Sequence, residues 1–197
     1  MLRSAIAPDL QVLGATVNNI VDDFGAFPLL AGDILKGVGI GTIDAMGMYR
    51  LDKQAWYSMS AYLRAYSRIE RELGPTFLYK AGLAIPRNAI FPKEIHDLES
   101  GLRSIDVAYH MNHARHGVSL FDALTGAMRE GIGHYRVEST GDRLLQVVCE
   151  NPYPCDFDRG IVEAMAKRFE PSARIFHATK PACRKVGGAS CTFHVEW

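Results

Sequence analysis

The chain has 197 residues, of which 48% are hydrophobic and 22% are charged, a composition typical of one globular domain and unlike that of a disordered chain. Its 22 basic and 22 acidic residues balance, which excludes recruitment of nucleic acid or anionic lipid by bulk charge. The most apolar stretch, residues 29–49, contains three charged residues and five glycines, so no membrane span is predicted. The start of the chain is too short and polar for a secretory signal, and we expect a cytoplasmic protein.

In the first part of the chain, apolar side chains recur at helical spacing. Residues 10–24 are predicted to form an amphipathic helix. The glycines that recur through residues 27–49 favour turns and short strands over a continuous helix. A second helix is predicted over residues 54–73 and a third within residues 93–114, where Gly101 is a point at which the helix can bend or split.

From residue 131 onward the pattern changes to strands. Residues 131–149 predict a β-hairpin, with a Ser-Thr-Gly-Asp turn, and residues 158–169 predict a short helix. Residues 173–178 and 191–197 read as two further strands. The order predicts an α+β fold in which helices cover an antiparallel sheet. We expect one domain, 1–197, with a helical part over about 1–115 and a sheet part over about 131–197.

The four cysteines, Cys149, Cys155, Cys183 and Cys191, all fall within the last 49 residues. Such clustering does not suit a disulfide framework that spans the fold, but it suits thiolate ligands of a metal ion. Zinc favours four tetrahedral thiolate or imidazole ligands. The spacings are not those of a zinc finger or ribbon, so four buried thiols without a metal remain the alternative.

The tail also resembles a known family. The segments NPYPCDFDRGIVEAMAKRF and ARIFHATKPACRKVGGASCTFHVEW are similar to the C-terminal half of the vinyl-reductase-like (4VR, hydrocarbon-binding) domain family, which is related to the sensor domains of phenol-responsive activators. The recurrent mark is a Cys, a helix, a strand and then Cys-x7-Cys-x-Phe, here Cys155, Cys183, Cys191 and Phe193. The resemblance implies a structural zinc ion bound by the three cysteines, near a pocket for a hydrophobic or aromatic molecule.

The fourth zinc ligand has two candidates in the sequence. Members of that family often carry a glutamate three residues before the first Cys of the pair, where this chain has Lys180, and an ammonium group cannot bind a metal. Cys149 is our preferred fourth ligand, because the cluster otherwise leaves one thiol unused, and His177 is the alternative.

Histidines form a second group, with His110 and His113 three residues apart and His134 on the predicted hairpin. They would allow a catalytic metal, but neither an HExxH motif nor a 2-His-1-carboxylate spacing is evident, which favours a polar pocket lining or a surface position. Aromatic side chains with polar ends can close the same pocket. The expected ligand-binding residues are Trp56, Tyr66, Phe77, Tyr109, His110, His113 and His134.

These observations predict a small-molecule binding protein, a sensor or carrier, with a structural zinc site. No catalytic residue is assigned, because no nucleophile elbow and no nicotinamide or flavin fingerprint is present. The alternatives are a metal-dependent enzyme acting on an aromatic or tetrapyrrole substrate, and a non-catalytic assembly subunit. A homodimer is expected, because the apolar face of the helix predicted over residues 10–24 has no neighbouring helix in sequence to cover it.

Overall fold

The computed structural model describes residues 7–24, 28–88, 93–180 and 182–197. The chain forms two compact units. The N-terminal unit contains the residues up to Phe77 together with His110–Arg129, and the C-terminal unit contains Leu78–Tyr109 and Glu130–Trp197. Helices and antiparallel sheets make up both units, which confirms the predicted α+β fold class.

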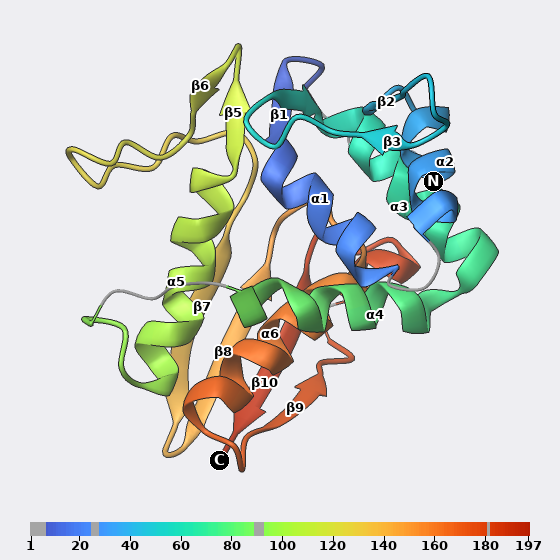
Figure 1. Ribbon diagram of the computed structural model, residues 1–197. Helices are drawn as coiled ribbons and strands as arrows, with labels where there is room; N and C mark the ends of the chain where they lie inside the picture. The colour runs from blue at the N-terminus through green and yellow to red at the C-terminus, as the bar shows by residue number, and fades with distance from the viewer. Residues whose placement is uncertain (1–6, 25–27, 89–92, 181) are drawn as a thin grey trace. The chain divides into compact units, whose positions relative to one another are not determined.

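The N-terminal unit packs helices with a four-stranded antiparallel sheet of order β4-β1-β5-β6 and a two-stranded sheet, β2-β3 (Figure 1). Its elements are β1 (Leu10–Leu13), α1 (Gly14–Asp23), α2 (Pro28–Gly37), β2 (Thr42–Ile43), β3 (Tyr49–Arg50), β4 (Trp56–Ser58), α3 (Met59–Leu73), β5 (His113–Arg115) and β6 (Val118–Ser119). Helix α3 buries one face, which includes Tyr62, Tyr66 and Ile69, as its apolar spacing predicts.

Two predicted helices begin later than expected. The helix predicted over residues 10–24 starts only at Gly14, because Leu10–Leu13 is a strand that pairs with both β4 and β5. Leu10 and Val12 are buried while their neighbours are half-buried, an alternation that fits a strand. Likewise Trp56–Ser58 is the strand β4, and the helix predicted over residues 54–73 starts at Met59. Sheet pairing, which local spacing does not reveal, decided both boundaries.

Residues 28–37 form helix α2, where turns and short strands were predicted. That prediction was wrong because it weighed the glycines above the apolar spacing. Ala31, Ile34 and Leu35 lie three and four residues apart and are fully buried, and their packing outweighs the helix propensity lost at Gly32. Phe27, which the prediction also covered, lies outside the described residues.

The apolar side chains of the N-terminal segment are covered within the chain. Val12, Val17 and Ile20 are at most 2% exposed. The uncovered helix face that suggested a homodimer is therefore not present at these residues, and the homodimer itself stays a prediction.

The C-terminal unit is an antiparallel sheet of order β7-β8-β10-β9 with helix α6 lying against it (Figure 1). The elements of this part of the chain are α4 (Pro75–Ala84), η1 (Ile85–Asn88), α5 (Leu98–Met111), β7 (Tyr135–Gly141), β8 (Leu144–Cys149), α6 (Cys155–Phe169), β9 (Arg174–His177), η2 (Arg184–Val186) and β10 (Cys191–Glu196). The predicted hairpin, helix and two strands are confirmed, with α6 beginning three residues earlier than expected. Helix α5 runs unbroken through Gly101.

Helix α6 is held in place by a close crossing with the C-terminal half of α4. A Cβ on Gly82 would collide with the backbone carbonyl of Phe157, and a Cβ on Gly160 would collide with that of Tyr79. Because both close approaches are to backbone atoms, only glycine fits at the two positions. This crossing positions the helix whose first residue is Cys155.

Among the helices of the described residues, none has both the length and the apolar character needed to cross a bilayer.

Candidate metal centre

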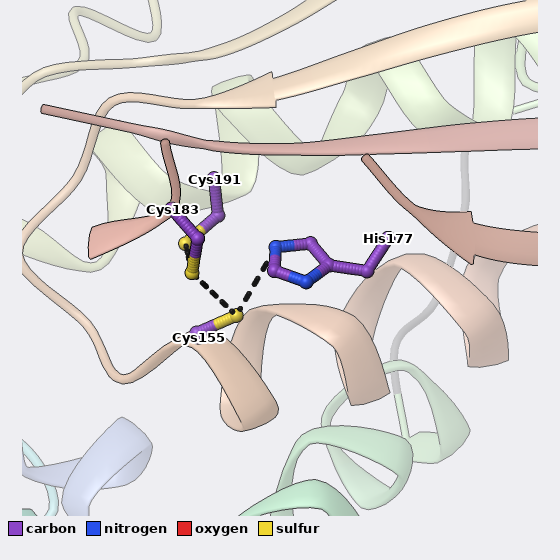
Figure 2. A group of neighbouring side chains, drawn as sticks. All are labelled: Cys155, His177, Cys183 and Cys191. Carbon is purple, nitrogen blue, oxygen red and sulfur yellow. Dashed lines mark hydrogen bonds between the residues drawn. The ribbon is translucent and has the colours of Figure 1, made fainter. Parts of the chain in front are cut away.

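Four side chains of the C-terminal unit converge at one end of the sheet, and we call them the Cys3His cluster: Cys155, His177, Cys183 and Cys191. Cys155 is the first residue of α6, His177 the last of β9 and Cys191 the first of β10, while Cys183 precedes η2. Figure 2 shows the three sulfurs and the imidazole pointing toward one another. Side chains as far apart in the sequence as Cys155 and Cys191, which are 36 residues apart, thus bring possible metal-ligand atoms close together.

The spacing of the cluster suits one tetrahedral ion. The Sγ atoms of Cys183 and Cys191 are 3.4 Å apart, those of Cys183 and Cys155 are 3.6 Å apart, and Cys155 Sγ lies 3.5 Å from His177 Nε2. All four ligand atoms lie within 4.8 Å of one another. A metal–sulfur distance of about 2.3 Å in a tetrahedral thiolate site places sulfurs about 3.8 Å apart. The distances between the ligand atoms are therefore close to the edge length of such a tetrahedron.

The loop between the last two cysteines has a local reason for its shape. The Cys183 sulfur accepts a hydrogen bond from the backbone N–H of Lys185 and so caps η2. Gly187 ends this turn at a φ of 91°, a left-handed conformation that favours glycine. Gly188 passes so close to the Ala182 carbonyl that a Cβ would not fit. The Gly-Gly pair in CRKVGGASC thus returns the chain to β10 with both sulfurs on the same side.

The register between β9 and β10 determines the sheet face from which His177 projects. His177 lies opposite Phe193 in the β9–β10 ladder, and their ring centroids are 5.0 Å apart. Cys191 is two residues before Phe193 and so projects from the same face of the sheet. The Nε2 atom of His177 lies 3.5 Å from Cys155 Sγ, so the imidazole stands in the fourth position of the cluster. Cys149 is buried opposite Cys191 in the β8–β10 ladder and is not part of the group.

The electrostatics of the cluster favour a thiolate at Cys191. Hydrogen bonding from Cys155, together with the Arg184 guanidinium, lowers the pKa of Cys191 to about 4. The same hydrogen bond and burial raise the pKa of Cys155, and burial raises the pKa of Cys183. The remaining thiol protons would have to leave when a metal ion binds, because the thiolate is the metal ligand.

A buried polar network lies beside the cluster. Arg184 Nε donates to the Cys191 sulfur at 3.3 Å, Nη1 contacts Asn151, and Nη2 pairs with the Asp158 carboxylate. Asp158 is fully buried and also accepts a hydrogen bond from the Tyr135 hydroxyl at 2.6 Å. Burial raises the pKa of Asp158 to about 6, and Arg184 opposes that rise.

Sequence reasoning missed Arg184 and Asp158. Asp158 is the first residue of the helix predicted over residues 158–169, where an aspartate is usually a solvated N-terminal charge. The signal that was present is the position of Arg184 directly after Cys183, which puts a cation within reach of the predicted ligands.

The expected ligand-binding residues fall in both units. In the N-terminal unit, Tyr66 is buried with its hydroxyl 2.9 Å from that of Tyr62, and Phe77 packs on Phe24 at 4.5 Å between ring centroids. Trp56 is half-buried in β4. His110 at the end of α5 and His113 at the start of β5 are buried. In the C-terminal unit, the Tyr109 hydroxyl donates to the Ile132 carbonyl. That these residues line a pocket stays a prediction.

His134 lies between two carboxylates. Its Nδ1 is 2.9 Å from Asp106 Oδ2, and its Nε2 is 3.0 Å from Glu130 Oε2. Burial lowers the pKa of His134, but the hydrogen bonds with Asp106 and Glu130 outweigh it, so the pKa stands above its ordinary value.

Substitution of His134 by glutamine is expected to make stability less dependent on pH. Because the folded-state pKa of His134 is raised, its ion pairs stabilise the fold fully below the unfolded-state pKa, about 6.5, and this contribution disappears as pH rises through the folded-state pKa. Urea unfolding of wild type and His134→Gln should differ by up to about 1 kcal/mol near pH 5.5, and the difference should shrink above pH 8. The exposed His96 is the matched control, and an equal pH dependence for His134→Gln and His96→Gln would contradict this assignment.

No protein-family model matches the chain, and no curated protein matches it. Solved structures of H-NOX proteins share its fold. A variant of an H-NOX protein from S. oneidensis, described in its Fe(II) ligation state, is 14% identical, with 93% of this chain and 95% of that chain covered and a TM-score of 0.65. A variant of the T. tengcongensis H-NOX is 13% identical, with 93% and 96% covered and a TM-score of 0.61. A third structure, described as probing heme distortion in the H-NOX family, is 13% identical, with 93% and 92% covered and a TM-score of 0.59.

These comparisons correct two expectations. The resemblance to the vinyl-reductase-like, hydrocarbon-binding family is wrong, because the solved structures that share the fold over nearly the whole chain are H-NOX proteins. A short Cys-rich tail, which carried that resemblance, is too little sequence to identify a family. The zinc cofactor that it implied is wrong as well, since the proteins with this fold are described with heme and Fe(II).

The donor set of the C-terminal unit does not fit heme. A heme iron takes its equatorial ligands from the porphyrin, so the protein supplies at most two axial side chains. The Cys3His cluster instead brings four ligand atoms within 4.8 Å of one another, which suits a single ion. Both ring nitrogens of His134 already contact carboxylates. Among the described residues of this unit, neither the cluster nor His134 therefore forms a heme site.

Proposed function

We propose that this chain is a small-molecule-binding sensor domain with an H-NOX-like layout. The observation that carries the proposal is the extent of the structural match, which covers 93% of this chain and 95% of the S. oneidensis protein at a TM-score of 0.65. The chain thus has the elements of a whole domain of that kind. Two of the structures that share the fold, both of an S. oneidensis H-NOX protein, are described by their ligation state, which supports a role in binding a small ligand.

We further propose that the Cys3His cluster holds one thiophilic divalent metal ion with a structural role. Cys155, Cys183 and Cys191 are the thiolate ligands, and His177 replaces Cys149 as the fourth, because its Nε2 lies 3.5 Å from Cys155 Sγ. Such an ion would tie α6, β9 and β10 together at the point where β9 ends and β10 begins. The free energy of metal binding would then contribute to the free energy of folding.

The ligand class that we propose is a compact apolar or aromatic molecule. Within the N-terminal unit, the paired hydroxyls of Tyr62 and Tyr66 place two polar groups inside an apolar core. Sites for small ligands combine apolar walls with a few such orienting groups. Heme, which the structures of similar fold are described with, is the alternative ligand, and the same experiment tests it.

The proposed ligand site is tested by thermal unfolding of the full chain with phenol, indole and hemin over a concentration series. A ligand that binds the folded state raises the free energy of unfolding by about 2.7 kcal/mol at 100 times its Kd. We expect a concentration-dependent rise in Tm with an aromatic compound, and we expect Tyr66→Trp, which fills the core, to abolish it. Arg136→Gln, which breaks an exposed ion pair, is the matched control. A shift of the hemin Soret band on addition of the protein, with no rise in Tm with the aromatic compounds, would identify heme as the ligand. No response of Tm or of the Soret band to any probe would contradict the sensor proposal.

A further inference from the structure

Arg184, the first residue of η2, makes polar contacts through its whole guanidinium group. Its Nε donates to Cys191 Sγ at 3.3 Å, its Nη1 donates to the Asn151 side-chain oxygen at 3.0 Å and to the Asn151 carbonyl, and its Nη2 pairs with Asp158. All three guanidinium nitrogens are thus engaged, in the planar fork that only arginine offers. The side chain is 15% exposed, and that of Asp158 is fully buried.

The proposed centre needs a compensating cation. Three thiolates and a neutral imidazole around a divalent ion carry a net charge of minus one, and Cys155 and Cys191 are buried. A buried net charge is costly unless it is paired and hydrogen-bonded. Arg184 supplies such a cation, because its guanidinium donates a hydrogen bond to the sulfur of Cys191. Residues that hydrogen-bond to metal ligands in this way tune the affinity of the protein for the metal.

We propose that Arg184 is a positioning residue of the metal centre, which balances the charge of the three-thiolate ligand set and holds Cys191 in its ligand position. This inference rests on the metal site proposed above. The competing explanation is that Arg184 serves only to neutralise the buried Asp158 carboxylate. Asp158 has other donors, the Tyr135 hydroxyl at 2.6 Å and the Asn151 amide at 3.3 Å, so the pairing with Asp158 does not by itself account for the contact with Cys191.

The two explanations are separated by a pair of charge-neutral replacements. In Arg184→Gln/Asp158→Asn both members of the buried ion pair are removed, so no carboxylate is left unpaired. Co²⁺ is titrated anaerobically into the reduced, metal-free full-length protein, and the thiolate-to-cobalt absorption and a competing chelator report binding and affinity. Circular dichroism checks that each variant is folded. Arg136→Gln is the matched control, since it removes an arginine whose pair with Glu150 lies on the surface.

We expect wild type, Arg136→Gln and Asp158→Asn to bind one Co²⁺ with similar affinity, and the double variant to bind it about 10- to 100-fold more weakly. If the double variant does not fold, the Co²⁺ affinities of Arg184→Lys and Arg184→Gln are compared instead. Arg184→Lys, which keeps the positive charge, is expected to bind Co²⁺ more tightly than Arg184→Gln. A folded double variant with wild-type affinity, or equal affinities for wild type and these two single variants, would overturn the role of Arg184. Failure of wild type to bind Co²⁺ at all would overturn the metal site itself, and with it this inference.

Discussion

Replacing Cys191 with serine is expected to weaken metal binding by about 100-fold or more, beyond the loss typical of an outer hydrogen-bond partner. The same substitution is expected to lower the free energy of unfolding of the metal-loaded protein. Both effects follow because Cys191 is fully buried, is the sulfur that Arg184 contacts, and belongs to a set whose binding free energy contributes to folding. A serine hydroxyl is a poor substitute for a thiolate with a lowered pKa.

Cys149→Ala is the matched control for this prediction. Cys149 is as buried as Cys191 and lies opposite it in the β8–β10 ladder, but it is outside the Cys3His cluster. Its removal should cost some packing energy and leave metal affinity unchanged. The measurement is Co²⁺ affinity together with urea unfolding in the presence and absence of metal. Equal metal affinities for Cys191→Ser and Cys149→Ala would show that the cluster is not the ligand set.

The second large effect is expected at the crossing of α4 and α6. Gly160→Val should lower the free energy of unfolding by about 3 kcal/mol, the upper range for overpacking, because its side chain would collide with backbone atoms of Tyr79, Gly82 and Leu83. Backbone cannot move away without displacing the helix that begins at Cys155. Chemical denaturation followed by circular dichroism measures the change.

Gly101→Ala serves as the comparison for Gly160→Val. The atoms that a Cβ on Gly101 would meet belong to the Phe169 ring, a side chain that can rotate, and alanine improves the helix propensity of α5. The cost at Gly101 should therefore be clearly smaller. Equal losses at the two glycines would mean that the backbone crossing is not what holds α6.

The part of the fold that the sequence predicts well is the part dominated by local signals. The β7–β8 hairpin, α6, β9 and β10 have clear alternation or helical spacing between turn residues, and all four were placed within a few residues. The N-terminal strands β1 and β4 were taken as the first turns of helices, because Leu10–Leu13 and Trp56–Ser58 become strands only through pairing with each other and with β5. Such long-range pairing leaves no local pattern in three- or four-residue strands.

The candidate site was predictable in residue type and less so in geometry. Clustering of the cysteines near the C-terminus indicated Cys155, Cys183 and Cys191, whose sulfurs lie close together in the structure. Cys149 and His177 both lie on the sheet face of Cys191. The choice between them depended on the approach of His177 Nε2 to within 3.5 Å of Cys155 Sγ, a long-range distance that is not readable from the sequence. Asp158 and Arg184 gained their roles from burial, a property of the folded packing and not of their positions in sequence.

The central claim, that the Cys3His cluster binds one metal ion, is tested most directly by native mass spectrometry of freshly purified, reduced protein prepared without added metal. We expect a mass increase that corresponds to one metal ion per chain, with thiol protons released as the thiolates bind the ion. The increase should be absent in Cys191→Ser and present in Cys149→Ala. A wild-type protein that carries no stoichiometric metal, and takes up none when Co²⁺ is supplied, would contradict it.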